Sequence, residues 1–259
     1  MTIKSVLFAG ICLSCPIAQA TILTNPPISP DDLAHWATTV VDFSPGPQDI
    51  NVIGSPTASQ GLPINALGPR NNGTVSLGDG GSITLAFDSP FSNSDGADFA
   101  VFENAFGFNG LIFAELGFVS VSSNGADFAT FPIIFDDPEL DDSFGSPFRL
   151  IDVDQTNNFA GVHSAPNGTG FDLSDLLSDS AVTSGLVDLD SILFIRITDA
   201  VGDGSTFDSL GNAIFDPYPT DLGAGGFDLD AVGTVAPVPV PPALVLLLSV
   251  LLPLNRLRR

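Results

Sequence analysis

Aspartate is the residue best placed to do chemistry in this 259-residue chain, and it is concentrated in one glycine-rich segment. Residues 198–232 read TDAVGDGSTFDSLGNAIFDPYPTDLGAGGFDLDAV. Several carboxylate oxygens on a backbone that can fold around an ion are what Ca²⁺ requires. We therefore expect either one structural calcium ion or acidic turns that are solvated at the surface. The candidate ligands are Asp199, Asp203, Asp216, Asp228, Asp230 and, from an apolar run that needs a reason to hold a charge, Glu103.

Known catalytic and calcium-binding motifs are missing from the sequence. Asp152-Val153-Asp154 begins like an EF-hand loop, but Asn157 stands where that loop needs glycine and His163 where it needs glutamate. The sequence also lacks the serine-hydrolase elbow, the zinc-protease helix and the phosphate loop. With 30 acidic residues, pairs suitable for glycoside hydrolysis arise by chance. We therefore predict a protein without catalytic residues, and a polysaccharide-active enzyme is the alternative.

Sugar binding would need an exposed aromatic ring of the right kind. The chain has one tryptophan, Trp36, and one tyrosine, Tyr218. Both are candidate ligand-binding residues, because a sugar ring stacks on such side chains while their polar ends reach a hydrogen-bond partner. Tyr218 lies between two prolines, so its alternative role is to pin the loop to the body.

Short runs of β-branched and aromatic residues, separated by turn-forming residues, must position these side chains. Such runs predict strands at 82–87, 97–102, 114–123, 126–135, 191–198 and 227–235. Helical patterns are limited to 31–37, behind Pro30, and 171–177. With 21 phenylalanines to fill a core, the pattern predicts an all-β fold, a single antiparallel β-sandwich over residues 21–236.

The charge distribution excludes some partners. All 30 acidic residues fall between Asp31 and Asp230, where the only basic residues are Arg70, Arg149 and Arg196. A surface of this sign repels nucleic acid and anionic lipid. We therefore expect no nucleic-acid partner.

The N-terminus, MTIKSVLFAGICLSCPIAQA, is typical of a secretory signal peptide. Its apolar run leads to Ala18-Gln19-Ala20, so we expect the Sec translocon to export the chain and cleavage of residues 1–20 to leave Thr21 first. The alternative is a lipoprotein signal at Cys12 or Cys15, which Pro16 and the missing leucine disfavour. Both cysteines lie in this segment, so the mature protein would have no disulfide.

The C-terminal segment 237–259 has three parts. It carries a proline motif, then an apolar stretch over 243–254, and then an arginine cluster; the motif and cluster are Val238, Pro239, Val240, Pro241, Pro242, Arg256, Arg258 and Arg259. Twelve helical residues cover about 18 Å, short of the roughly 30 Å hydrocarbon core. The segment is therefore a marginal membrane anchor, with its arginines on the cytoplasmic side.

This layout resembles the PEP-CTERM class of bacterial sorting signals, in a V-P-x-P variant. The resemblance implies that an exosortase-type enzyme reads the tail, which enters the inner membrane only transiently, and leaves the protein at the cell surface or in the extracellular matrix. VSLGDGGSITLAF (75–87), GADFAVFENAF (96–106) and FDPYPTDLGAGGFDLDAVG (215–233) resemble uncharacterised bacterial cell-surface proteins that carry such tails. That resemblance implies a jelly-roll body, similar to galactose-binding modules.

These observations predict three domains: a signal peptide (1–20), a β-sandwich (21–236) and a sorting signal (237–259). The expected function is a surface or matrix protein whose non-catalytic sandwich binds or scaffolds extracellular polysaccharide. A purely structural coat protein is a further alternative.

Overall fold

The computed structural model describes residues 25–70, 73–136, 148–220 and 223–236. The signal-peptide residues Ala18, Ala20 and Thr21 lie outside this range, as does the whole sorting segment. Where the chain is described, its regular secondary structure is mostly β, and every strand pairing is antiparallel. Within the same residues, no helix has the length and apolar content to span a bilayer. The all-β prediction is therefore confirmed.

Two large sheets form the body. Sheet A has the strand order β1–β13–β6–β17–β2, and β4 pairs separately with β17. Its strands are β1 (Pro27–Ile28), β2 (Leu33–Trp36), β4 (Val75–Ser76), β6 (Phe99–Glu103), β13 (Gly168–Phe171) and β17 (Asp228–Val235). Sheet B has the order β10–β9–β14–β5–β3. Its strands are β3 (Thr39–Ser44), β5 (Ser82–Phe91), β9 (Gly117–Ser122), β10 (Ala129–Thr130) and β14 (Ile192–Asp199).

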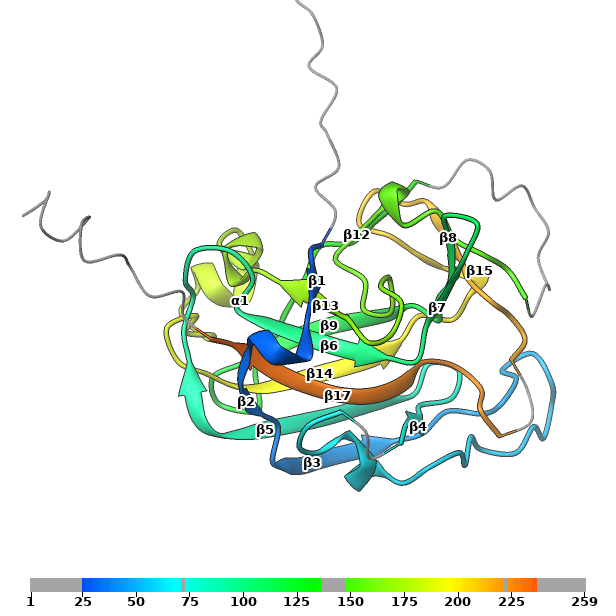
Figure 1. Cartoon of the computed structure of the whole chain (residues 1–259), viewed down its shortest axis with the longest axis horizontal. Helices are drawn as coiled ribbons and strands as arrows, with labels where there is room; N and C mark the ends of the chain where they lie inside the picture. The colour runs from blue at the N-terminus through cyan, green and yellow to red at the C-terminus, as the bar shows by residue number, and fades with distance from the viewer. Residues whose placement is uncertain (1–24, 71–72, 137–147, 221–222, 237–259) are drawn as a thin grey trace, which may run out of the picture.

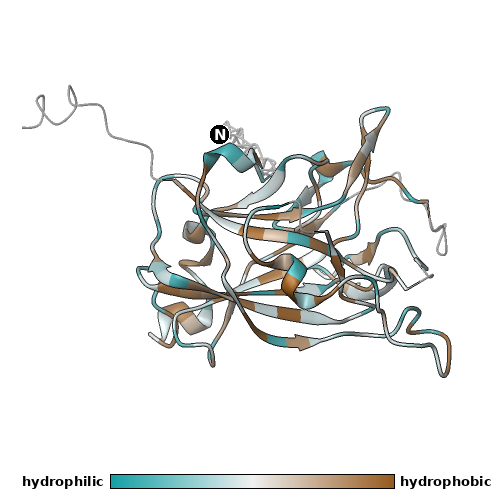
Figure 2. Ribbon diagram, turned by 60° about the horizontal axis from the view of Figure 1, so that its bottom comes forward, coloured by the Kyte–Doolittle hydropathy of each residue, from teal (hydrophilic) through white to brown (hydrophobic). Residues whose placement is uncertain are grey.

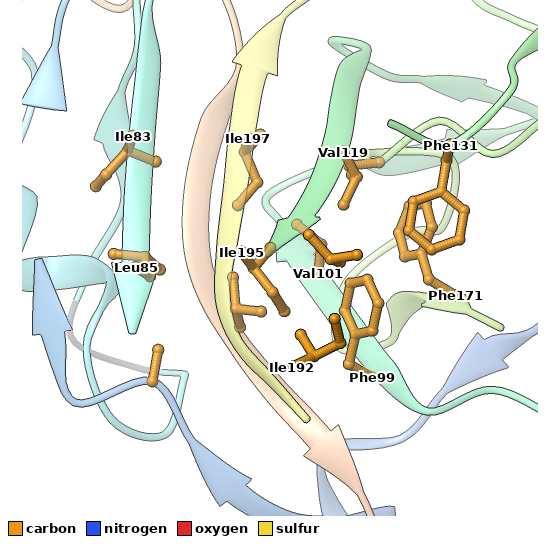
Figure 3. Packing of buried hydrophobic residues seen from close by; sticks show 14 of the residues in the cluster. Ile83, Leu85, Phe99, Val101, Val119, Phe131, Phe171, Ile192, Ile195 and Ile197 are labelled. Atoms are coloured by element: carbon orange, nitrogen blue, oxygen red, sulfur yellow. The ribbon is translucent and has the colours of Figure 1, made fainter. Parts of the chain in front are cut away.

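The two sheets pack face to face. Their long strands run across the molecule in nearly the same direction (Figure 1), and hydrophobic residues alternate with hydrophilic ones along them (Figure 2). One apolar cluster joins Phe99 and Val101 of β6 to Ile195 and Ile197 of β14 (Figure 3). Phe171 stacks on Phe99, with ring centroids 5.2 Å apart. Alternating side chains on facing sheets bury one continuous core, as in a β-sandwich.

Three small two-stranded sheets and a second apolar cluster cover one end of the sandwich. The sheets are β7 (Phe106–Phe108) with β8 (Leu111–Phe113), β11 (Ile134–Phe135) with β12 (Thr156–Asn157), and β15 (Asp203–Phe207) with β16 (Ala213–Phe215). In Figure 1, β7, β8 and β15 gather at the upper right. The cluster beneath the last two of these sheets includes Leu116, Ile151 and Phe159, each fully buried.

Among the described residues, helical structure is confined to single turns. These are the 3₁₀ turns η1 (Pro30–Asp32), η2 (Pro63–Ala66), η3 (Val153–Gln155) and η4 (Leu173–Leu176), and the short helix α1 (Ser180–Thr183). The predicted helix over 171–177 is the turn η4, which Asp172 caps through the amide of Ser174.

Two sequence predictions of local structure are wrong. Residues 33–36, expected to be helical, form strand β2, because they pair with the end of β17. The run 126–135, expected to be one strand, is divided into β10 and β11, which belong to different sheets.

Candidate functional sites at the two ends of the sandwich

Antiparallel pairing collects acidic residues at one end of the sandwich. Glu103 ends β6 opposite Leu229, next to Asp228 at the beginning of β17. Asp199 ends β14 opposite Gly117, with which β9 begins. The backbone amide of Phe227 donates to Asp199 Oδ1 at 2.7 Å, which ties the beginning of β17 to the end of β14. The ends of both sheets therefore meet here.

Besides Asp208, which lies between β15 and β16, six residues with carboxyl groups at this end are at least nine-tenths buried. They are Asp79, Glu103, Glu115, Asp199, Asp216 and Asp228. Burial raises the pKa of Glu103 and of Glu115 well above the usual range, and the charge of Asp228 adds to both shifts. Burial also raises the pKa of Asp216, with a contribution from Asp199. Carboxylates that raise one another's pKa while buried favour a bound proton or a bound cation.

We call four of these groups the acidic cluster: Glu103, Glu115, Asp216 and Asp228. The charges of Asp228, Glu103 and Asp216 raise the pKa of Glu115. The charges of Asp228 and Asp216 raise the pKa of Glu103. The cluster therefore contains three of the predicted calcium ligands and one glutamate, Glu115, that the sequence reasoning missed. The signal that identified Glu103, a charge in an apolar run, applies equally to Glu115 in AELGFVSV.

The other three predicted ligands have partners of their own. Asp199, whose pKa burial raises to about 7, accepts backbone N–H groups with both oxygens, from Gly80 and Phe227. Asp203 accepts from Asn51 and from the amide of Ser205 on the exposed side of β15.

Asp230 is not a member of the acidic cluster. It forms a salt bridge with Arg70, whose Nη2 is 3.0 Å from Asp230 Oδ2. The expectation that Asp228 and Asp230 could share a site or face water is wrong. Both are buried, and Asp228 accepts hydrogen bonds from Ser76 and Asn104 instead.

The described residues contain no group of three or more histidine, cysteine, aspartate or glutamate side chains that is arranged to hold a metal ion. The acidic cluster is therefore a concentration of buried charge and not a finished coordination shell.

Tyr218 does not offer an exposed platform for a sugar. Its side chain is only 4% exposed. Its hydroxyl donates to Asp49 Oδ1 at 2.6 Å and accepts from Asn51 Nδ2 at 2.8 Å. Tyr218 therefore pins its loop to the loop around Asp49, which is the alternative role predicted for it.

Trp36 lies in a groove at the opposite end of the sandwich. The chain crosses there from sheet A to sheet B, between β2 and β3, alongside the end of β5. A hollow of about 330 Å³ is lined by Ala34, His35, Trp36, Thr38, Phe87, Asp88 and Ser89. A second hollow of about 360 Å³ shares Ala34 and His35 and continues past Phe91, Ser92 and Ser94 to Val235. We call the two together the Trp36 groove.

Packing on one side fixes the indole of Trp36. Its ring lies 5.5 Å from the ring of Phe102, centroid to centroid. Gly233 makes this possible, since a Cβ there would come within 3.0 Å of the indole. The side chain is half-buried and held, as a binding platform requires.

Polar groups that can bind hydroxyls surround this indole. Thr38 Oγ1 donates to Asp88 Oδ1 at 2.7 Å, and both side chains are exposed, as are His35 and Ser89. Asp98, at the far end of the groove, is different. It is buried and accepts from the amide and hydroxyl of Ser94 and from the amide of Leu173, so its role is structural.

No protein-family model matches the chain, and no curated protein shows significant similarity to it. Function is therefore inferred from the residues and their geometry.

Proposed function

We propose that this protein is an exported surface or matrix protein whose non-catalytic β-sandwich binds neutral extracellular polysaccharide in the Trp36 groove. The observation that carries this proposal is the position of the single tryptophan, partly buried and fixed by packing, among side chains that donate and accept hydrogen bonds.

The composition of the groove suits a sugar. The C–H face of a pyranose ring is apolar and stacks on an aromatic ring, whereas its hydroxyls need donors and acceptors at the edge. The indole of Trp36 supplies the flat apolar surface, and Thr38, Asp88 and Ser89 supply the polar edge. A few polar groups around an apolar surface are the usual means by which a pocket orients its ligand.

The charge of the protein points to a neutral polymer. The chain has 30 acidic residues against seven basic ones, and Asp88 and Asp98 themselves line the groove. A polyanionic glycan would be repelled.

The finer fold that we propose is a jelly roll of the galactose-binding type. Its support is the way the chain alternates between the sheets: β2 is in sheet A, β3 in sheet B, β4 in A, β5 in B and β6 in A. Fold alone does not define a ligand.

Export and sorting complete the proposal and rest on the two ends of the sequence. The signal peptide (1–20) implies passage through the Sec translocon. The tail (237–259), by its resemblance to a sorting signal, implies processing by an exosortase-type enzyme after transient insertion in the inner membrane.

Affinity electrophoresis in gels that contain polysaccharide from the protein's own cells tests the proposal. We expect the wild-type protein to be retarded and Trp36→Ala to migrate freely. Phe106→Ala is the matched control, since it removes an exposed aromatic ring near the acidic end. Equal retardation of wild type and Trp36→Ala would place binding elsewhere. New reducing ends in the polymer would reveal an enzyme instead.

A further inference from the structure

The described body of the chain ends beside the Trp36 groove. Val235, at the end of β17, lines the groove, and the amide of Ala236 donates to the carbonyl oxygen of Asp32 at 2.9 Å. Asp32 directly precedes β2, the strand that carries Trp36. The residues that follow Ala236 in the sequence therefore start next to the groove.

The proline motif follows at once. Residues 237–242 read PVPVPP. Proline restricts its own φ to about −65° and directs the residue before it toward an extended conformation. Such a sequence favours a polyproline II helix, which has no internal hydrogen bonds and leaves its carbonyl groups in need of donors. Segments of this kind bind with little loss of conformational entropy, because the free chain already has the bound shape.

The groove has the chemistry that binds such a segment. Proline-rich segments bind grooves lined by aromatic rings, and Trp36, Phe87 and Phe91 line this one. The rings of Phe87 and Phe91 are in edge contact, with centroids 5.4 Å apart. The exposed hydroxyl groups of Ser89 and Ser92 can donate to carbonyl groups of the motif. The motif carries no charge, so the acidic surface of the body does not repel it.

The motif is also long enough to reach the indole. Val235 pairs with Leu33, which is three strand positions, or about 10 Å, from Trp36. The chain must reverse its direction after Ala236 to run back along β2. If the next two residues make that turn, residues 239–242 still span about 12 Å in a polyproline II helix.

We propose that the proline motif of the chain's own tail docks in the Trp36 groove, with its prolines against Trp36, Phe87 and Phe91. A tether this short gives a local concentration of about 1 mM. A motif with a Kd of about 0.1 mM as a free peptide is then docked in roughly nine molecules of ten.

The docking itself is independent of polysaccharide binding. Its consequence rests on the proposed function: a polysaccharide must displace the motif from Trp36, which lowers the apparent affinity of the groove for the polymer.

Trp36 reports the docking directly, because it is the only tryptophan in the chain. The experiment measures acrylamide quenching of its fluorescence in the full chain, in detergent micelles and without polysaccharide. The triple variant Pro239→Ala, Pro241→Ala, Pro242→Ala should uncover the indole, raise the quenching constant about twofold and shift the emission to the red. Pro253→Ala is the matched control, since it removes a proline from the same tail outside the motif, and it should leave both unchanged.

A synthetic peptide of residues 236–243 tests the same contact in trans. Added to the triple variant, it should restore the shielded emission saturably, with a midpoint of about 0.1 mM. The same peptide with alanine in place of every proline should have no effect.

Equal quenching in the wild type and the triple variant would overturn the proposal, as would a proline peptide that leaves the emission of the variant unchanged. Shielding that rises with protein concentration would also overturn it, because the motif would then come from a second copy. Neither experiment contains polysaccharide, so these outcomes are distinct from a failure of the proposed function, which the Trp36 variant tests separately.

Discussion

Acid should stabilise this protein in the absence of divalent ions, and Asp79 allows the effect to be measured at one residue. Burial raises the pKa of Asp79 from 3.8 to about 6. The folded protein therefore keeps this proton up to about pH 6, whereas the unfolded chain releases it near pH 3.8. The stability contributed by the proton is complete below pH 3.8 and is lost as the pH rises through 6.

The magnitude follows from the size of the shift. A difference of about two pKa units corresponds to about 3 kcal/mol in total, at 1.36 kcal/mol per unit. Integration over the titration places about 1.4 kcal/mol of this between pH 5 and pH 8. Because the neighbouring Asp49 and Asp203 contribute to the shift and are more accessible to solvent, we expect a measured effect of about 1 kcal/mol.

Asp79→Asn removes this contribution together with the part of the Asp199 and Asp216 pKa shifts that the Asp79 charge causes, which has the same sign. Asparagine can still accept the hydrogen bond that the amide of Ile50 donates at 2.7 Å. Urea unfolding with chelator at pH 5, 6, 7 and 8 gives the free energy of unfolding of both proteins. We expect the wild type to lose about 1 kcal/mol relative to the variant between pH 5 and pH 8. His163, whose pKa burial lowers, acts in the opposite direction but equally in both proteins. A difference that is constant, or that moves in favour of the wild type as pH rises, would refute the reasoning.

Two further predictions concern packing and processing. Phe171→Ala removes a fully buried ring that contacts Phe99 and Phe131 and should cost about 3–5 kcal/mol in urea unfolding; the half-exposed Phe106→Ala should cost under about 1 kcal/mol, and similar costs for both would contradict the assigned core. Intact-mass analysis of the protein from its own cells should show a chain that starts at Thr21 and ends near Pro242, whereas a retained Arg259 would indicate a permanent anchor.

The strands that carry the core could be predicted from sequence because their signal is local. Alternation in SITLAF and SILFIRIT corresponds to β5 and β14, which supply Ile83, Leu85, Ile195 and Ile197 to the core. Strand β2 could not be predicted, because its residues are extended only through pairing with β17, about 200 positions later in the chain. Local propensity carries no information about such a partner.

The site residues also fall into two classes: those with a local signal in the sequence and those that depend on distant parts of the chain. Glu103 was identifiable because a charge inside an apolar run needs a reason. The partner of Asp230 could not be predicted, because Arg70 lies 160 residues away in the sequence. The register of β17 also shifts between Leu229 and Ala231, which alternation does not reveal. The Trp36 groove depends on the corner where β2 and the end of β5 meet, which only the folded chain brings together.

Fluorescence of the single tryptophan tests the central claim most directly, because Trp36 is the only indole in the chain and lines the groove. We predict that titration with a neutral oligosaccharide cut from the native polymer changes its emission saturably, with a midpoint equal to that of calorimetric binding. Calorimetric binding of the same oligosaccharide without any change in Trp36 emission would contradict the account.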